Sequence, residues 1–300
     1  MGPNRLPSQL VQWIESLTTS TPNNPPQMAK KRKSKDTSSK LPVYKGKFGQ
    51  REAERLLWRA GFGPKPGDVK RLKKLGMKRA VHSLVNHRGR TKLVGPGPKL
   101  EDPLNPSDIW GPDHIWWLDR MVRSNNPLQE RMALIWHDWF ATSNDGVGNQ
   151  GLMLAQNATL RRNGLGSFKN LLLSVTQDPA MLVWLSGNQN SKDSPNENYG
   201  RELMELFTLG AGARYSEQDV REQARALTGF TNDWDDDVGL KNFHFDAKLH
   251  DDDSKTIFGK SGNFGWVDSC KLCLQHPDHS TFFVTKLWSY FVPVPLKGRD

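Results

Sequence analysis

The chain has 300 residues, of which 36% are hydrophobic and 25% charged, and its formal net charge is +10. This composition is typical of a soluble globular protein, and two cysteines exclude a disulfide-stapled scaffold. No apolar run reaches the roughly 18 residues that a membrane-spanning helix needs. Residues 1–17 lack the apolar core of a signal peptide, so the chain as given is expected to be cytoplasmic.

The positive charge is concentrated in the first third of the chain. Residues 1–100 hold 23 Lys and Arg against 5 Asp and Glu, a net +18, whereas the other 200 residues hold 19 against 27, a net −8. Because the basic part has no recognised nucleic-acid-reading motif, we expect nucleic acid to make no more than non-specific contact with the N-terminal tail.

In chain order, residues 1–45 are predicted to be a disordered basic tail, because they are rich in Pro, Ser, Thr and Lys and poor in large apolar residues. Residues 46–300 are predicted to form one mainly α, multi-helix globular domain. Residues 88–108 are Gly- and Pro-rich and predict a surface loop, and residues 231–262 predict a long acidic loop or a small β-hairpin. Apolar spacing predicts helices over residues 53–60, 69–75, 78–85, 113–124, 128–142, 151–162, 168–177, 180–185, 217–227, 267–274 and 279–291.

The densest polar signal lies between residues 195 and 210. On a helix, Tyr199, Leu203, Leu206 and Phe207 would form one apolar stripe. Asn198, Glu202 and Glu205 would share the flank of that stripe, since they are spaced i, i+4, i+7. Two carboxylates one turn apart can bind a metal or share a proton; alternatively, they form ion pairs with Arg201, Arg221 or Arg225.

A histidine, His137, lies in a helix that is apolar almost all round. Such a helix is expected to be buried, so its histidine must find a partner, either as a metal ligand or as a satisfied core residue.

The loop at His250 and Asp251 joins a histidine to carboxylates, a combination typical of metal sites; alternatively, it is an exposed acidic loop. The nearby aspartates 233, 235 and 237 resemble the start of a calcium loop, but Val238 occupies the required glycine position. Cys270 and Cys273 form a CxxC pair with no second pair to complete a zinc site. The chain has no phosphate-binding loop, GxSxG elbow or HExxH motif, so nucleotide hydrolysis and serine-esterase chemistry are not supported.

The sequence contains the stretches Leu56–Pro64, Trp136–Phe140, Asp178–Leu182, Pro195–Gly210, Tyr215–Val220, Ala224–Phe230, His250–Asp251, Lys255–Thr256, Phe258–Gly259 and Lys286–Trp288. Together they resemble a bacterial family known as Domain of Unknown Function 1800. The resemblance implies a mostly helical protein, often exported and often encoded beside a sulfatase-like partner family, and it implies no particular activity. The chain departs from the family at Trp139, where relatives tend to carry a second histidine. It ends at Asp300, so we expect it to lack the family's C-terminal portion.

Two functional hypotheses follow. In the first, a divalent metal activates water for a hydrolase-type reaction on a polymer or glycan-like substrate, with Glu202, Glu205 and His137 as the catalytic groups. In the second, the protein is a non-catalytic binding or assembly protein: the same residues form a structural polar network, and the basic third docks an acidic partner. The metal ligands of the first hypothesis would come from His137, Glu197, Glu202, Glu205, His250 and Asp251.

Overall fold

The structure is a computed structural model that describes residues 44–99, 106, 111–237 and 239–292. Within these residues the chain is mainly helical, as predicted, with two small antiparallel hairpins. The predicted tail lies almost entirely outside the described residues, so the division near residue 46 stays a prediction.

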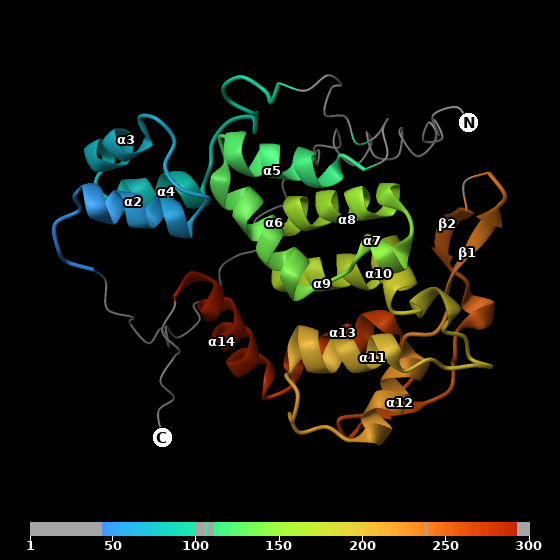
Figure 1. Cartoon of the computed structure of the whole chain (residues 1–300). Helices are drawn as coiled ribbons and strands as arrows, with labels where there is room; N and C mark the ends of the chain where they lie inside the picture. Colours follow the sequence, from blue (N-terminus) through green and yellow to red (C-terminus); the bar gives the residue numbers. More distant parts are fainter. Residues whose placement is uncertain (1–43, 100–105, 107–110, 238, 293–300) are drawn as a thin grey trace.

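The helices form three successive groups (Figure 1). The first, at one end of the molecule, contains α2 (Gln50–Arg59), α3 (Asp68–Leu75) and α4 (Met77–Val85). The central group contains α5 (Asp113–Arg123), α6 (Pro127–Trp139), α7 (Asn144–Val147), α8 (Gln150–Asn163), α9 (Phe168–Thr176) and α10 (Pro179–Trp184). The last contains α11 (Asn198–Glu202), the π-helical segment η2 (Leu203–Thr208), α12 (Glu217–Ala226), α13 (Trp266–Gln275) and α14 (His279–Phe291).

Helix α6 lies at the centre of the main core, as its all-round apolar sequence predicts. Trp139 and Phe140 at its C-terminal end are fully buried, and the ring of Phe168 packs against both. The indole of Trp139 donates a hydrogen bond to the carbonyl of Phe207 over 3.1 Å, and Trp136 donates to Gly164 over 2.8 Å. The polar edges of the core tryptophans are therefore satisfied by backbone groups.

Both ends of α12 are determined by local sequence. The Ser216 hydroxyl accepts from the Asp219 amide, and the Asp219 carboxylate accepts from the Ser216 amide, which is a capping box. The chain leaves the helix at Gly229, whose φ of 109° is unfavourable for other residues. A Cβ at Gly229 would also lie 2.6 Å from the ring of Phe245, so this position requires glycine for two reasons.

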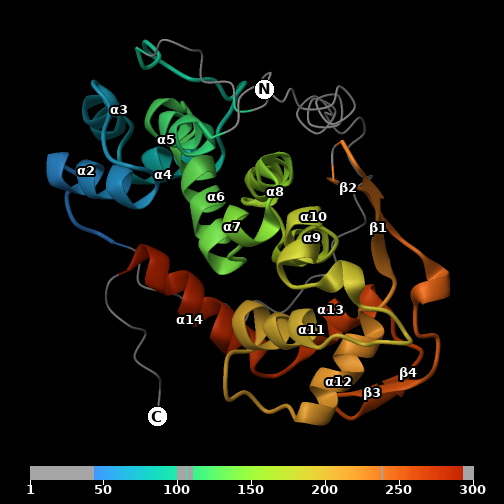
Figure 2. The same ribbon diagram turned by 45° about the vertical axis from the view of Figure 1, so that its right-hand side comes forward.

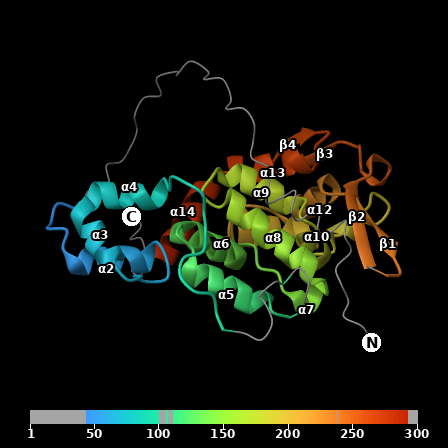
Figure 3. The ribbon, with the colours of Figure 1, turned by 90° about the horizontal axis from the view of Figure 1, so that it is seen from above.

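The predicted hairpin region contains two hairpins. Strands β1 (Phe230–Asp235) and β2 (Gly239–Phe245) pair antiparallel with a register shift between Thr231 and Asp233. They lie at the end of the molecule opposite α2–α4 (Figures 1 and 3). Strands β3 (Lys255–Ile257) and β4 (Lys260–Gly262) form the second hairpin beside α12 (Figure 2).

The expected apolar stripe between Tyr199 and Phe207 is only partly correct. Tyr199, Leu203 and Phe207 are buried, but Leu206 is 50% exposed. The expectation for Leu206 was wrong because the chain changes from α to π geometry at Leu203, and the wider turn rotates the following side chains away from 3.6-residue spacing.

Candidate functional site

Three glutamates, one just before α11, one on η2 and one on α12, surround an arginine of α11. Arg201 lies 3.0 Å from Glu197, 2.8 Å from Glu217 and 3.8 Å from Glu205. The hydrogen bonds and the charge of Glu217 and Glu197 raise the pKa of Arg201, and Arg201 in turn lowers the pKa of Glu217. The ion-pair alternative was stated for Glu202 and Glu205. Of these two, Glu205 lies near Arg201, and Glu197 pairs with the same arginine.

Glu202, on the same segment, has a different environment. Burial, followed by repulsion from Glu205, raises the pKa of Glu202, and Arg201 only partly opposes this. Burial and the Glu205 carboxylate likewise raise the pKa of the nearby Tyr215 to about 12. A carboxyl group whose pKa is raised, beside a second carboxylate, is suited to acid–base chemistry.

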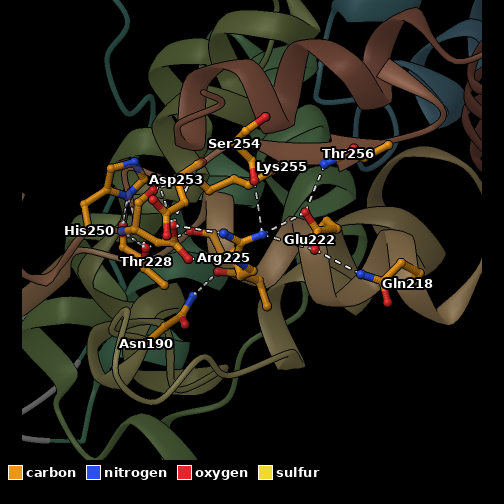
Figure 4. Close-up of polar contacts among 12 residues, drawn as sticks. Asn190, Gln218, Glu222, Arg225, Thr228, His250, Asp253, Ser254, Lys255 and Thr256 are labelled. Carbon is orange, nitrogen blue, oxygen red and sulfur yellow. Dashed lines mark hydrogen bonds and ion pairs between the residues drawn. The ribbon is translucent and has the colours of Figure 1, made fainter. Parts of the chain in front are cut away.

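His250 and Asp251 belong to a second polar cluster, centred on Arg225 of α12 (Figure 4). The Arg225 guanidinium lies 2.7 Å from Asp251 and 3.0 Å from Glu222. Glu222 also accepts hydrogen bonds from the Thr256 amide over 2.9 Å and from the Gln218 side chain over 3.0 Å. Burial alone would raise the pKa of Asp251, but the hydrogen bonds from Arg225 and the Asp253 amide outweigh it and lower that pKa.

Lys255 closes this cluster from the β3 side. Its side chain is 1% exposed, and the ammonium donates to the carbonyls of Asp251 and Asp253, the latter over 2.8 Å. Burial lowers the pKa of Lys255, and the charge of Asp251 opposes the shift. A buried ammonium is stable here because carbonyls and a carboxylate surround it.

The imidazole of His250 is held by Thr228, at the end of α12. Its Nδ1 lies 2.9 Å from the Thr228 carbonyl and 3.1 Å from the Thr228 hydroxyl, and that hydroxyl accepts from the Asp251 amide over 2.9 Å. Asn190 adds a link below the cluster, since its side chain donates to the Ala224 carbonyl over 2.9 Å (Figure 4). These bonds join the loop at His250, the end of α12 and the segment around Asn190 into one unit.

His137 lies apart from both clusters, in the wall of a cavity of about 230 Å³ between α5, α6, α7 and α8. The ring of Trp117 contacts the imidazole edge-on, with 5.3 Å between ring centres. Burial lowers the pKa of His137, Asp138 opposes the shift and His114 reinforces it. The neutral imidazole is therefore favoured near neutral pH.

The residues expected to hold a metal are not gathered at one point. Throughout the described part of the chain, no three His, Cys, Asp or Glu side chains lie close enough together to hold a metal ion. Glu197 and Glu205 contact Arg201, Asp251 contacts Arg225, His250 contacts Thr228, and His137 lines the separate cavity. Cys270 and Cys273 are buried free thiols in contact with Thr176 and Gln223, respectively.

Three charged residues of the second cluster were not predicted as site residues. Glu222 and Arg225 are three residues apart, which signals a helical ion pair in the sequence. Lys255 gives no such signal, since a lysine between polar residues normally predicts an exposed side chain. Only the arrangement of β3 against α12 accounts for its burial.

Comparison with known proteins identifies the family of the chain. A family model described as "Protein of unknown function (DUF1800)" matches residues 55–295. The chain belongs to the DUF1800 family. No curated protein and no solved structure matches it. This DUF1800 chain has no helix, within the residues that the structure describes, with the length and apolar character to cross a membrane.

Proposed function

We propose that this DUF1800 protein is a binding or assembly protein that docks a partner protein with an acidic surface. The docking surface is the basic face, which we define as the exposed Lys and Arg side chains of α2–α4 that form no ion pair with a described residue. They are Arg51, Arg55, Arg59, Lys70, Lys73, Lys74, Lys78 and Arg79.

The charge of this segment is the observation that carries the proposal. Residues 44–99 hold 16 Lys and Arg side chains against three Asp and Glu. Asp68 pairs with Arg71 at 3.1 Å, whereas Arg51, Arg55 and Arg59 on α2 have no ion-pair partner within 4.0 Å among the described residues. Such a concentration of unpaired charge favours a partner of opposite sign and speeds its association.

Apolar side chains among these cations favour a protein over a nucleic acid. Trp58, 62% exposed, lies one turn from Arg55 on α2, and Val81 and Val85 are exposed one turn apart on α4. Aliphatic side chains gain nothing from a phosphate backbone, but they can be buried against another protein. The sulfatase-like partner family implied by the resemblance is the first candidate to test.

The polar cluster around Arg225 also supports the proposal, because its charged groups are already paired with one another. Asp251, Glu222 and Lys255 have their charges matched within the chain, so these groups are occupied in holding α12 against β3 and the loop at His250. In this proposal they keep the helices in register, and recognition takes place at the basic face.

Site-specific cross-linking tests the proposal. A photoreactive phenylalanine derivative placed at position 58 in the full chain, in its source cell, should label one partner protein through an Asp- and Glu-rich peptide. The variant Arg55→Glu/Arg59→Glu should lose the adduct, whereas the control Lys248→Glu, an exposed lysine outside the basic face, should keep it. A nuclease-sensitive adduct, or one that survives charge reversal, would contradict the proposal.

A metal-dependent hydrolase acting on a polymer or glycan-like substrate is the second candidate. It is favoured by the raised pKa of Glu202 beside Glu205, and by the π-helical segment, a feature that often occurs at functional sites. In this alternative, Glu202 and Glu205 act as metal ligands or as the general base, with histidine ligands. Loss of hydrolysis in Glu202→Gln with the fold intact is the expected signature.

A further inference from the structure

The two ends of the molecule carry opposite charge. At one end lies the basic face, in a segment where residues 44–99 hold 16 Lys and Arg against three Asp and Glu. At the other end lies the acidic end, which we define as residues 230–237 and 239–253 of β1, β2 and the loop after them (Figures 1 and 3). These residues hold eight Asp and two Lys, with no Glu or Arg. Each end of one copy is therefore complementary in charge to the other end of a second copy.

Two carboxylates of the acidic end form no ion pair within the described part of the chain. Asp235 pairs with Lys241 over 2.6 Å, whereas Asp236 and Asp237 are exposed and have no such partner. Asp236 accepts a hydrogen bond from the indole of Trp234 over 3.1 Å. Because a carboxylate has about four acceptor positions, it can still bind an arginine, and such charge-assisted pairs are roughly twice as strong as neutral hydrogen bonds.

An exposed tryptophan lies beside the charges at each end. Trp234 on β1 is 68% exposed, and Trp58 on α2 is 62% exposed, one turn from Arg55. Tryptophan and arginine are the residues that most often dominate the free energy of binding at protein interfaces, and a guanidinium can also pack on an indole face. The acidic end therefore offers the basic face both carboxylates for its arginines and an indole that they can contact.

One copy cannot bring its own two ends together. The helices α2–α4 and the β1–β2 hairpin lie at opposite ends, with the central group of helices between them (Figures 1 and 3). The two surfaces can therefore meet only between copies. Because the surfaces differ, the interface is heterologous, and each dimer keeps one free basic face and one free acidic end to which further copies can add.

From this complementarity we infer that the acidic end of one copy docks on the basic face of a second copy, so that the chain assembles head to tail. The carboxylates of Asp236 and Asp237 pair with arginines of α2, and the indole of Trp234 contacts the basic face beside them. This inference rests on the proposed function, because it uses the same basic face, and it names a second copy of this chain as a partner with the required acidic surface.

Sedimentation velocity of the purified full chain tests the inference. Small interfaces are weak, so the protein is studied at about 0.1 mM and about 50 mM salt, where wild type should form dimers and larger species. These species should be lost at about 500 mM salt, because salt screens exposed charges. The variants Arg55→Glu/Arg59→Glu and Asp236→Lys/Asp237→Lys should each be monomeric, whereas the control Asp145→Lys, at an exposed aspartate outside both surfaces, should assemble like wild type.

An equimolar mixture of the two charge-reversed variants gives the sharpest result. The unchanged acidic end of Arg55→Glu/Arg59→Glu meets the unchanged basic face of Asp236→Lys/Asp237→Lys, so assembly should return in the mixture. Association of either variant alone, or its absence from wild type or from the mixture, overturns the inference. A monomeric wild type together with a cross-link from position 58 to another acidic protein would overturn only the self-docking, so its failure is distinguishable from failure of the proposed function.

Discussion

Asp178 should make the stability of the protein depend on pH. It caps α10, where its carboxylate accepts hydrogen bonds from the Met181 amide over 3.2 Å and from Gln156 over 2.9 Å. Burial raises its pKa from 3.8 to about 7, despite the opposing effect of these hydrogen bonds. Between these two pKa values, the folded state holds a proton that the unfolded state has lost.

Because of this difference, the free energy of unfolding falls as the pH rises between the two pKa values. The contribution of Asp178 to the free energy of unfolding is complete below the unfolded pKa of 3.8 and is lost as the pH rises through about 7. Since a difference of one proton is worth ~1.4 kcal/mol per pH unit, the loss from about pH 5 to about pH 7 is on the order of 2 kcal/mol. Asp178→Asn keeps the acceptor oxygen and the volume but cannot ionise, so it should lack this loss.

Urea unfolding of wild type and Asp178→Asn at intervals from about pH 5 to about pH 8 measures the difference. The stability of the variant relative to wild type should increase by ~2 kcal/mol across this range, whereas Asp145→Asn, at an exposed aspartate, should follow the wild-type profile. Parallel profiles for wild type and Asp178→Asn would refute the argument that Asp178 is protonated in the folded protein.

Three further predictions follow from the same structure. Arg225→Met leaves Glu222 and Asp251 without their cation, so it should lower the free energy of unfolding in urea by about 3 kcal/mol. The control Arg221→Met, at an exposed arginine, should lower it by less than about 0.5 kcal/mol. Equal losses in the two variants would contradict a structural role for the Arg225 ion pairs. Leu206→Ser should leave the free energy of unfolding nearly unchanged, because Leu206 is exposed, whereas Leu203→Ala should lower it by about 3 kcal/mol, because Leu203 is buried. A larger loss in Leu206→Ser than in Leu203→Ala would refute the π-helical geometry. Burial raises the pKa of Cys270 to about 12 and that of Cys273 further, so neither thiol should react with a disulfide reagent at about pH 8 until the protein unfolds; rapid labelling of the folded chain would contradict their burial.

Local sequence predicted the elements whose boundaries depend on neighbouring residues. The helix predicted over residues 217–227 is α12, Glu217–Ala226, and the helix predicted to be buried because it is apolar almost all round is α6. The exposure of Leu206 was not predictable in this way. It depends on a π turn, and 3.6-residue spacing does not represent such a turn.

In the candidate site, the contacts between neighbouring residues could be predicted from the sequence, but those between distant residues could not. The sequence offered Arg201 as an ion-pair partner for Glu205, and the two side chains lie 3.8 Å apart. The contacts of Arg225 with Asp251, and of His250 with Thr228, connect residues more than 20 positions apart. Their pairing is decided by how β3 and the loop before it pack against α12, which sequence spacing does not encode.

The central claim is that the carboxylates and histidines between Glu197 and Asp251 stabilise the fold, while the partner protein binds at the basic face. Calorimetric titration of Zn²⁺ and Mn²⁺ into the chelator-treated full chain, in wild type, Glu202→Gln and His250→Gln, tests it most directly. The account predicts the same metal-binding heat in all three proteins. A one-to-one metal site in wild type that disappears in both folded variants would contradict it and establish the metal-dependent enzyme instead.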